Sequence, residues 1–175
     1  MHISGKHPVS LTDGLPGIVF LAAVILTCLS AGIFYAYAVS VVPGLGRVKD
    51  SAYLTAYQSI NRAILNPWFL IVFMAPVFLL PFSAWQQFSQ PANLAWWALV
   101  AAGAIYITGV FGVTVACNVP LNEWLDKQDL ASAGEQTLKE WRLRFEEPWN
   151  RWNVVRTAAS VVSAILSVWA ILRLK

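Results

Sequence analysis

Two amides and an arginine stand close together where the last apolar run of the chain begins. In PWNRWNVVRTAAS, residues 148–160, Asn153 and Arg156 are followed by Thr157 and Ser160 at helical spacing. If these groups faced lipid, their hydrogen-bonding atoms would be left unpaired at a high free-energy cost, so they must face other helices. A guanidinium and amides on one inward helix face can all hydrogen-bond to a ligand, and this face therefore predicts a polar pocket inside the bundle.

Polar and aromatic side chains also gather at the same predicted level of the other three apolar runs. Together these groups could supply hydrogen bonds and flat apolar surfaces to one enclosure. The candidate catalytic residues are Arg156, Asn153, Asn118 and Tyr35. The candidate substrate-binding residues are Asn61, Asn122, Tyr57, Trp149 and Trp152.

A purely structural interpretation exists for each of these residues. Arg156 lies within a turn of the helix start, so its head could extend to lipid headgroups. Asn153 could cap the helix or tie two helices together, and Asn118 and Asn122 could be turn residues around Pro120. The tryptophans could belong to the aromatic belt at a membrane surface. A functional site requires the guanidinium to lie in the bundle interior.

The composition is that of a membrane protein. Of the 175 residues, 58% are hydrophobic and 12% are charged, whereas soluble domains have roughly 45–50% and about 25%. The many Trp, Phe and Tyr residues are typical of chains that meet bilayer interfaces. The net charge is +3, but basic residues are dispersed among acids. We therefore expect membrane lipids as partners and no nucleic acid.

Histidines and cysteines offer no metal site of ordinary type. The two histidines, His2 and His7, lie in the polar N-terminal arm without accompanying carboxylates or thiols. Cys28 and Cys117 lie in different apolar runs and should be at different depths, so no disulfide between them is expected. We therefore expect neither a metal nor another cofactor.

Four apolar runs are long enough to cross a bilayer, for which about 20 helical residues suffice. We predict an all-α fold in which residues 1–175 form a single membrane domain, a four-helix transmembrane bundle. Pro76 and Pro81 predict a kinked second span unless neighbouring side chains satisfy the freed carbonyls. The predicted spans are about 17–43, 64–85, 92–118 and 154–172.

Two polar segments between the spans also show helical periodicity. Apolar residues in the segment 51–65 predict an amphipathic helix before the second span. The segment 119–153 predicts a short amphipathic helix in the loop between the third and fourth spans. Ser132 and Glu135 fit a capping box at its start. Pro148 is expected to end that helix or to open the fourth span.

Lysines and arginines are concentrated in two of the loops, 44–63 and 119–153. The positive-inside rule therefore predicts a multi-pass protein of the cell membrane with these loops in the cytoplasm and both termini outside. Small residues on the faces of the first and third spans leave room for a homo-oligomer or a partner subunit.

Four segments carry a resemblance to a known family. AGIFYAYAVSVVPGLGR, AYQSINRAILNPWF, VTVACNVPLNEWL and WNRWNVVRTAA resemble, in this order, the recurring segments of the anthrone oxygenase family of small membrane proteins. The resemblance runs from about Gly17 to the C-terminus. Several members have a histidine after the WN pair, where this chain has Val154. The positions that match the recurring motifs are Pro43, Asn61, Asn66, Pro67, Asn118, Pro120, Asn122, Trp152, Asn153 and Arg156.

The resemblance implies a four-helix membrane protein that oxidises a polyketide anthrone to its anthraquinone with O₂, without metal or flavin. An anthrone has an acidic C–H, so the protein must desolvate the ring, stabilise an oxyanion and accept a proton. Arg156, Asn118 and Asn153 could hold the oxyanion. No buried His, Asp or Glu is apparent as a base, and Tyr35 or Tyr37 could serve only with a lowered pKa.

The expected function is thus oxidation of a small aromatic or quinone-like lipophile in a cytoplasm-side intramembrane pocket. The alternative is a non-catalytic accessory or scaffold protein, in which the amides lock helices together and the segment 119–153 docks a partner. A carrier of small hydrophobic molecules is a third interpretation. A cavity lined by Asn118, Asn153 and Arg156 would favour the enzyme, whereas mutual pairing of these groups with no room between helices would favour the scaffold.

Overall fold

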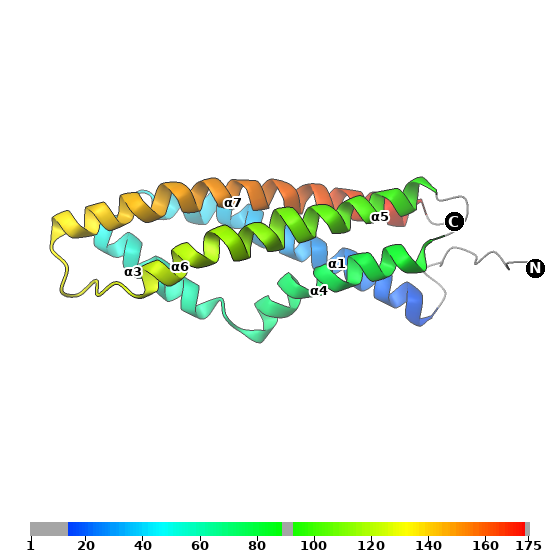
Figure 1. Ribbon diagram of the computed structural model, residues 1–175, viewed down its shortest axis with the longest axis horizontal. Coiled ribbons are helices and arrows are strands. Elements are labelled where there is room, and N and C mark those ends of the chain that lie inside the picture. Colours follow the sequence, from blue (N-terminus) through cyan, green and yellow to red (C-terminus); the bar gives the residue numbers. More distant parts are fainter. Residues whose placement is uncertain (1–13, 89–92, 174–175) are drawn as a thin grey trace, which may run out of the picture.

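The computed structural model describes residues 14–88 and 93–173, which form an elongated helical bundle (Figure 1). No strand occurs among these residues, and the all-α prediction is confirmed. Four helical stretches are long and apolar enough to cross a membrane. His2 and His7 lie outside the described residues. The four stretches are Leu15–Leu45, Pro67–Gln86, Leu94–Asp126 and Glu135–Leu172.

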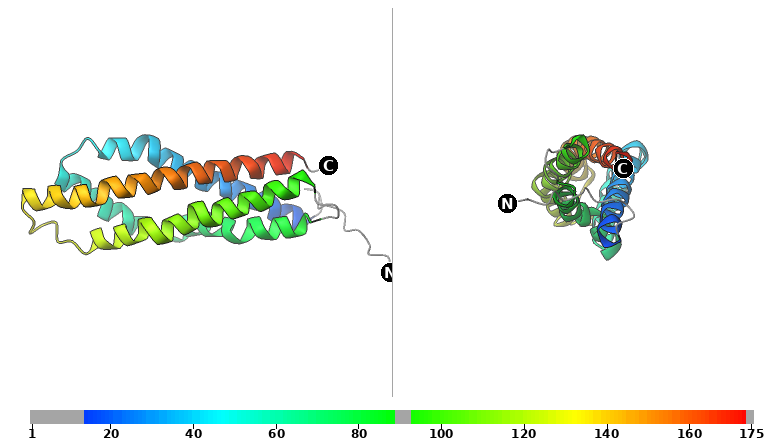
Figure 2. Two further views of the ribbon diagram at one scale, coloured as in Figure 1. Left: turned by 45° about the horizontal axis from the view of Figure 1, so that its top comes forward. Right: turned by 90° about the vertical axis from the view of Figure 1, so that its right-hand side faces the viewer.

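The four spans pack in a ring. Helix α1 (Leu15–Ala36) contacts α4 (Pro67–Gln86) and α7 (Glu135–Leu172), and α5 (Leu94–Ile105) contacts the same two helices. The start of α1 and the end of α7 lie at one end of the bundle (Figure 2). Helix α3 (Asp50–Ala63) lies at the other end, beside the first part of α7.

Helix α7 is longer than a bilayer requires. Its 38 residues extend roughly 57 Å at 1.5 Å per residue, whereas a hydrocarbon core is about 30 Å thick. The predicted amphipathic segment is thus continuous with the fourth span. Pro148 lies inside the helix without ending it, since Phe145 and Trp149 on either side are buried in one cluster.

The start of α7 differs from the predicted capping box. Gly134 is the N-cap residue, and no side chain caps the helix. The Ser132 hydroxyl instead donates to the Asp129 carbonyl at 3.3 Å. Ser132 therefore stabilises the turn before the helix, and the capping-box prediction was wrong.

Prolines in the first and third spans follow widened, π-helical turns. Helix η1 (Tyr37–Val41) comes just before Pro43, and η3 (Thr114–Asn118) comes just before Pro120. A proline ring clashes with the carbonyl four residues earlier, and the wider turn leaves room for it. The spans therefore continue as α2 (Val42–Leu45) and α6 (Val119–Asp126), beyond the predicted ends at residues 43 and 118.

Tyr106 supports the backbone of α4 next to Pro76. Its hydroxyl donates to the Phe73 carbonyl at 3.0 Å and lies 2.7 Å from the Ser30 hydroxyl oxygen. Phe73 is in the turn where the proline withholds a backbone donor. The carbonyl that Pro76 itself leaves without a donor is that of Val72, four residues earlier, so Tyr106 adds a bond to the neighbouring carbonyl and ties α4 to the third span.

We expect Tyr106→Phe to lower the free energy of unfolding in detergent by about 1–2 kcal/mol, because the ring stays in the core while its hydrogen bonds are lost. Unfolding in a titration with sodium dodecyl sulfate measures this difference. Tyr35 is exposed, so Tyr35→Phe is a matched control with an expected change below about 0.5 kcal/mol. Equal losses in the two variants would contradict this role of Tyr106.

Helix α7 approaches η2 (Tyr106–Gly112) closely at Gly109. A Cβ atom placed there would lie 2.7 Å from the Cβ of Ala159, closer than such atoms approach in proteins. We therefore expect Gly109→Val to force the helices apart and to lower the free energy of unfolding by about 1–3 kcal/mol. Gly32 has open space around it, and Gly32→Val should melt close to the wild-type temperature. Thermal unfolding of both variants in one detergent tests the difference.

Arg142 of α7 binds the loop between α2 and α3 through hydrogen bonds and an ion pair. Its guanidinium donates to the carboxylates of Glu146 at 2.6 Å and Asp50 at 2.9 Å. It also donates to the carbonyls of Val48 at 2.8 Å and Gly46 at 2.9 Å. These bonds hold the start of α3 against α7, and the end of α3 forms one wall of the site described next.

Candidate functional site

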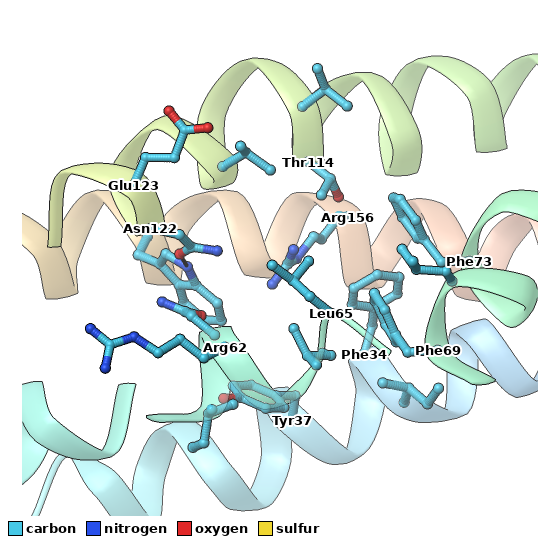
Figure 3. A pocket seen from close by; sticks show the side chains of 18 of the residues that line it. Phe34, Tyr37, Arg62, Leu65, Phe69, Phe73, Thr114, Asn122, Glu123 and Arg156 are labelled. Carbon is cyan, nitrogen blue, oxygen red and sulfur yellow. Dashed lines mark hydrogen bonds between the residues drawn. The ribbon is translucent and has the colours of Figure 1, made fainter. Parts of the chain in front are cut away.

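A cavity of about 530 Å³ lies where α3 ends and α4 begins (Figure 3). Its other walls come from α1 with η1, from η2, η3 and α6, and from α7. Small-molecule pockets commonly have volumes of roughly 300–1,000 Å³ and mostly apolar walls. The aromatic residues that line the cavity are Phe34, Tyr37, Phe69, Phe73, Phe111 and Trp149.

Arg156 reaches this cavity from α7, and its side chain is 7% exposed. Its Nε and Nη2 donate to Oδ1 of Asn153 at 3.2 and 3.1 Å. Its Cζ lies 4.7 Å from the ring centre of Phe34 and 4.9 Å from that of Trp149. No carboxylate in the described ranges forms an ion pair with it. The cavity therefore contains a buried cation in the bundle interior without a neutralising anion.

The amides near the cavity are only partly paired. Oδ1 of Asn122 accepts the indole N–H of Trp149 at 2.8 Å. Nδ2 of Asn118 donates to the Trp149 carbonyl at 3.3 Å, while its Oδ1 has no partner within the described part of the chain. The buried Nδ2 of Asn61, a residue that lines the cavity, also has no partner within the described part of the chain. Such atoms leave hydrogen-bonding capacity for water or a ligand.

The structure brings most of the predicted site residues together. Tyr35 and Trp152 do not line the cavity and are 56% and 40% exposed. Tyr37 follows Tyr35 by two residues, about 200° around a helix, and lines the cavity in its place. The predicted residues that line it are Asn61, Asn122, Trp149 and Arg156. Those buried behind them are Asn118, Asn153 and Tyr57.

Much of this site falls in a region that matches a known family. The family model described as anthrone oxygenase matches residues 68–166, more than half of the chain. The chain belongs to the anthrone oxygenase family. The matched region includes α4 except its first residue, the third span and Arg156. Neither the curated proteins nor the solved structures that were compared with the chain matched it.

Part of the cavity in this anthrone oxygenase family member comes from outside the matched region. Phe34 and Tyr37 are contributed by the first span and Asn61 by α3, all before residue 68. Arg62 at the end of α3 pairs with Asp126 at the end of α6, with 2.6 Å between Nε and Oδ1. The first span and α3, which precede the matched region, thus form part of the cavity wall.

Two groups of lining residues were not predicted from the sequence. Phe69 and Phe73 lie one turn apart on α4 and stack with 5.5 Å between ring centres, and their i, i+4 spacing was a usable signal. Glu123 and Asp126 line the outer end of the cavity. They were missed because the predicted third span ends at residue 118.

Tyr57 is neutral in this anthrone oxygenase family member at ordinary pH. Burial raises the pKa of its phenol well above the usual value, because the phenolate would lose its hydration, and the nearby Arg156 offsets only part of this. Tyr57 can therefore donate a hydrogen bond but is a poor base. In residues 14–88 and 93–173, no group of three or more His, Cys, Asp or Glu could hold a metal ion.

Proposed function

We propose that this protein oxidises a small aromatic lipophile with O₂ in the cavity at Arg156, without a cofactor. The observation that carries the proposal is the guanidinium of Arg156, which lines an aromatic cavity and has no carboxylate partner in the described chain. Such a cation favours the anionic form of a weakly acidic ligand. The family's name supports an anthrone-like substrate.

An anthrone can react with O₂ once it has lost a proton. The proton leaves from the CH₂ group opposite the carbonyl, and the negative charge moves to the carbonyl oxygen. In the proposed complex, Arg156 binds this oxyanion while Trp149 and Tyr37 flank the rings and keep water from the ring faces. The anion passes one electron to O₂, and the radical and superoxide combine at the same carbon to give a peroxide anion. This anion takes back the proton that the substrate lost, and loss of water from the resulting hydroperoxide gives the anthraquinone. One anthrone and one O₂ thus yield one anthraquinone and one water.

The proton acceptor in this scheme is Glu123. It lines the outer end of the cavity with Asp126, and Asp126 is already paired with Arg62. The Glu123 carboxylate points away from Arg156 (Figure 3), so the proton would reach it through water. Tyr57 is unsuited to this role because of its raised pKa.

Oxygen uptake by the purified protein tests the proposal. With 1,8-dihydroxyanthrone in detergent, we expect consumption of one O₂ per anthraquinone formed, at a rate well above that of protein-free detergent. Ethylenediaminetetraacetate should leave the rate unchanged, because the scheme uses no metal. A rate equal to that of spontaneous oxidation would contradict the proposal.

A non-catalytic scaffold is the second candidate, because two amides tie the third span to α7. Asn118 and Asn122 both bond to Trp149 of α7, whereas the bonds between Asn153 and Arg156 lie within α7. In that function the surface of segment 119–153 docks a partner subunit. The scaffold predicts no turnover by the wild type and a co-purifying protein that is lost when exposed residues of this segment are changed.

A further inference from the structure

The cavity is longer than a three-ring aromatic needs. Its lining residues on the third span run from Phe111 to Lys127, roughly 24 Å along a helix at 1.5 Å per residue. Three fused six-membered rings fill only part of that length. A ligand that uses the whole cavity is therefore elongated.

Arg156 divides the cavity into two parts of different chemistry. Its guanidinium lies between the ring of Trp149 and the ring of Phe34. Figure 3 shows Asn122 on one side of it and Phe69 and Phe73 on the other. We call the side of Asn122 the polar sector, which consists of Tyr37, Asn61, Asn122 and Trp149. We call the other side the phenylalanine sector, which consists of Phe34, Phe69, Phe73, Met74 and Phe111.

The two sectors differ in what they can bind. In the polar sector, the buried Nδ2 of Asn61 has no partner within the described residues and can donate to a ligand oxygen. The phenylalanine sector presents packed rings, with 5.9 Å between the ring centres of Phe73 and Phe111. Thr114 borders it, but its hydroxyl already donates to the Val110 carbonyl at 2.7 Å. An apolar group therefore gains most from occupying this sector.

The rim of the cavity shows the same division. Near α4 and η3 it is formed by the exposed apolar residues Leu65, Leu70 and Val115. At the other end it is formed by the ion pair of Arg62 with Asp126, whose side chains are both exposed. An apolar group can therefore enter from lipid beside the phenylalanine sector, while the polar end meets water.

Resting on the proposed function, we infer that the ligand is an acidic aromatic ring that carries an apolar side chain. The ring occupies the polar sector with its anionic oxygen on Arg156 and a second oxygen near Asn61. The side chain occupies the phenylalanine sector. This is an amphiphile that dissolves in the bilayer and reaches the cavity laterally.

Two probes and two tryptophan variants test this assignment. The probes are 2-hydroxy-1,4-naphthoquinone, an anionic ring at neutral pH, and its 3-octyl derivative. Met74→Trp fills the phenylalanine sector, whereas Ile71→Trp adds the same bulk to an exposed position of α4 that does not line the cavity. Calorimetric titration in one detergent compares each probe between variants, so partitioning into micelles cancels.

We expect Met74→Trp to weaken binding of the octyl derivative about tenfold or more and of the parent ring less than about twofold. Ile71→Trp should change neither affinity. Equal weakening of both probes by Met74→Trp would overturn the inference, and so would decanoate that binds as tightly as the octyl derivative. If Arg156→Gln leaves both affinities unchanged, the proposed function fails at this cavity, which is a separate outcome.

Discussion

Arg156→Gln lowers kcat/KM for an anthrone-type substrate by about 10²–10³, the loss that follows removal of an oxyanion-stabilising donor, and leaves the protein folded in detergent. The guanidinium is buried without a carboxylate partner in the described chain, so its charge favours an anionic ligand and not the fold. Replacing it with a neutral amide removes an uncompensated charge. The free energy of unfolding should therefore fall by no more than about 1 kcal/mol.

Arg156→Lys separates charge from geometry in this experiment. Lysine keeps the positive charge but lacks the planar fork that donates to Asn153 through two nitrogens. We expect its kcat/KM between those of the wild type and the Gln variant. Oxygen uptake and thermal unfolding on the same preparations give both readouts. A large loss of stability in Arg156→Gln would show that the residue is a structural tie, as the scaffold function requires.

Trp149→Ala lowers the free energy of unfolding by about 3–5 kcal/mol, the usual cost of truncating a buried aromatic side chain. Trp149 is 3% exposed. Its ring centre lies 5.7 Å from that of Tyr37 and 5.1 Å from that of Tyr57. The truncation would leave a void between the first span, α3 and α7 and would also remove the indole bond to Asn122. Unfolding in sodium dodecyl sulfate at several protein concentrations measures the loss.

Trp152→Ala is the matched control, because Trp152 lies on the same helix one turn away and is 40% exposed. Its loss should stay below about 1 kcal/mol. Trp149→Phe keeps a ring but loses the bond to Asn122, for which we expect about 1–2 kcal/mol. Similar losses for Trp149→Ala and Trp152→Ala would mean that the cavity wall contributes little to stability.

Tyr35 and Tyr37 illustrate where prediction from the sequence stops. Both lie at the polar end of the first span, and their types and positions make either a candidate. The choice between them depends on how the helix is rotated about its axis, and its apolar residues surround it too evenly to determine that rotation. Contact with α4 and α7 sets the rotation, turning Tyr37 to the cavity and leaving Tyr35 exposed.

The amino-acid sequence by itself determined four spans, the membrane class and the grouping of Arg156 with Asn153, because a bilayer requires long apolar helices and turns polar side chains toward other helices. The tertiary structure decided that the third span continues through Pro120 to Asp126 and that α7 is one helix through Pro148. It also decided that a cavity remains beside Arg156. These outcomes depend on how side chains from distant segments fill the space between helices, and no local pattern encodes that volume.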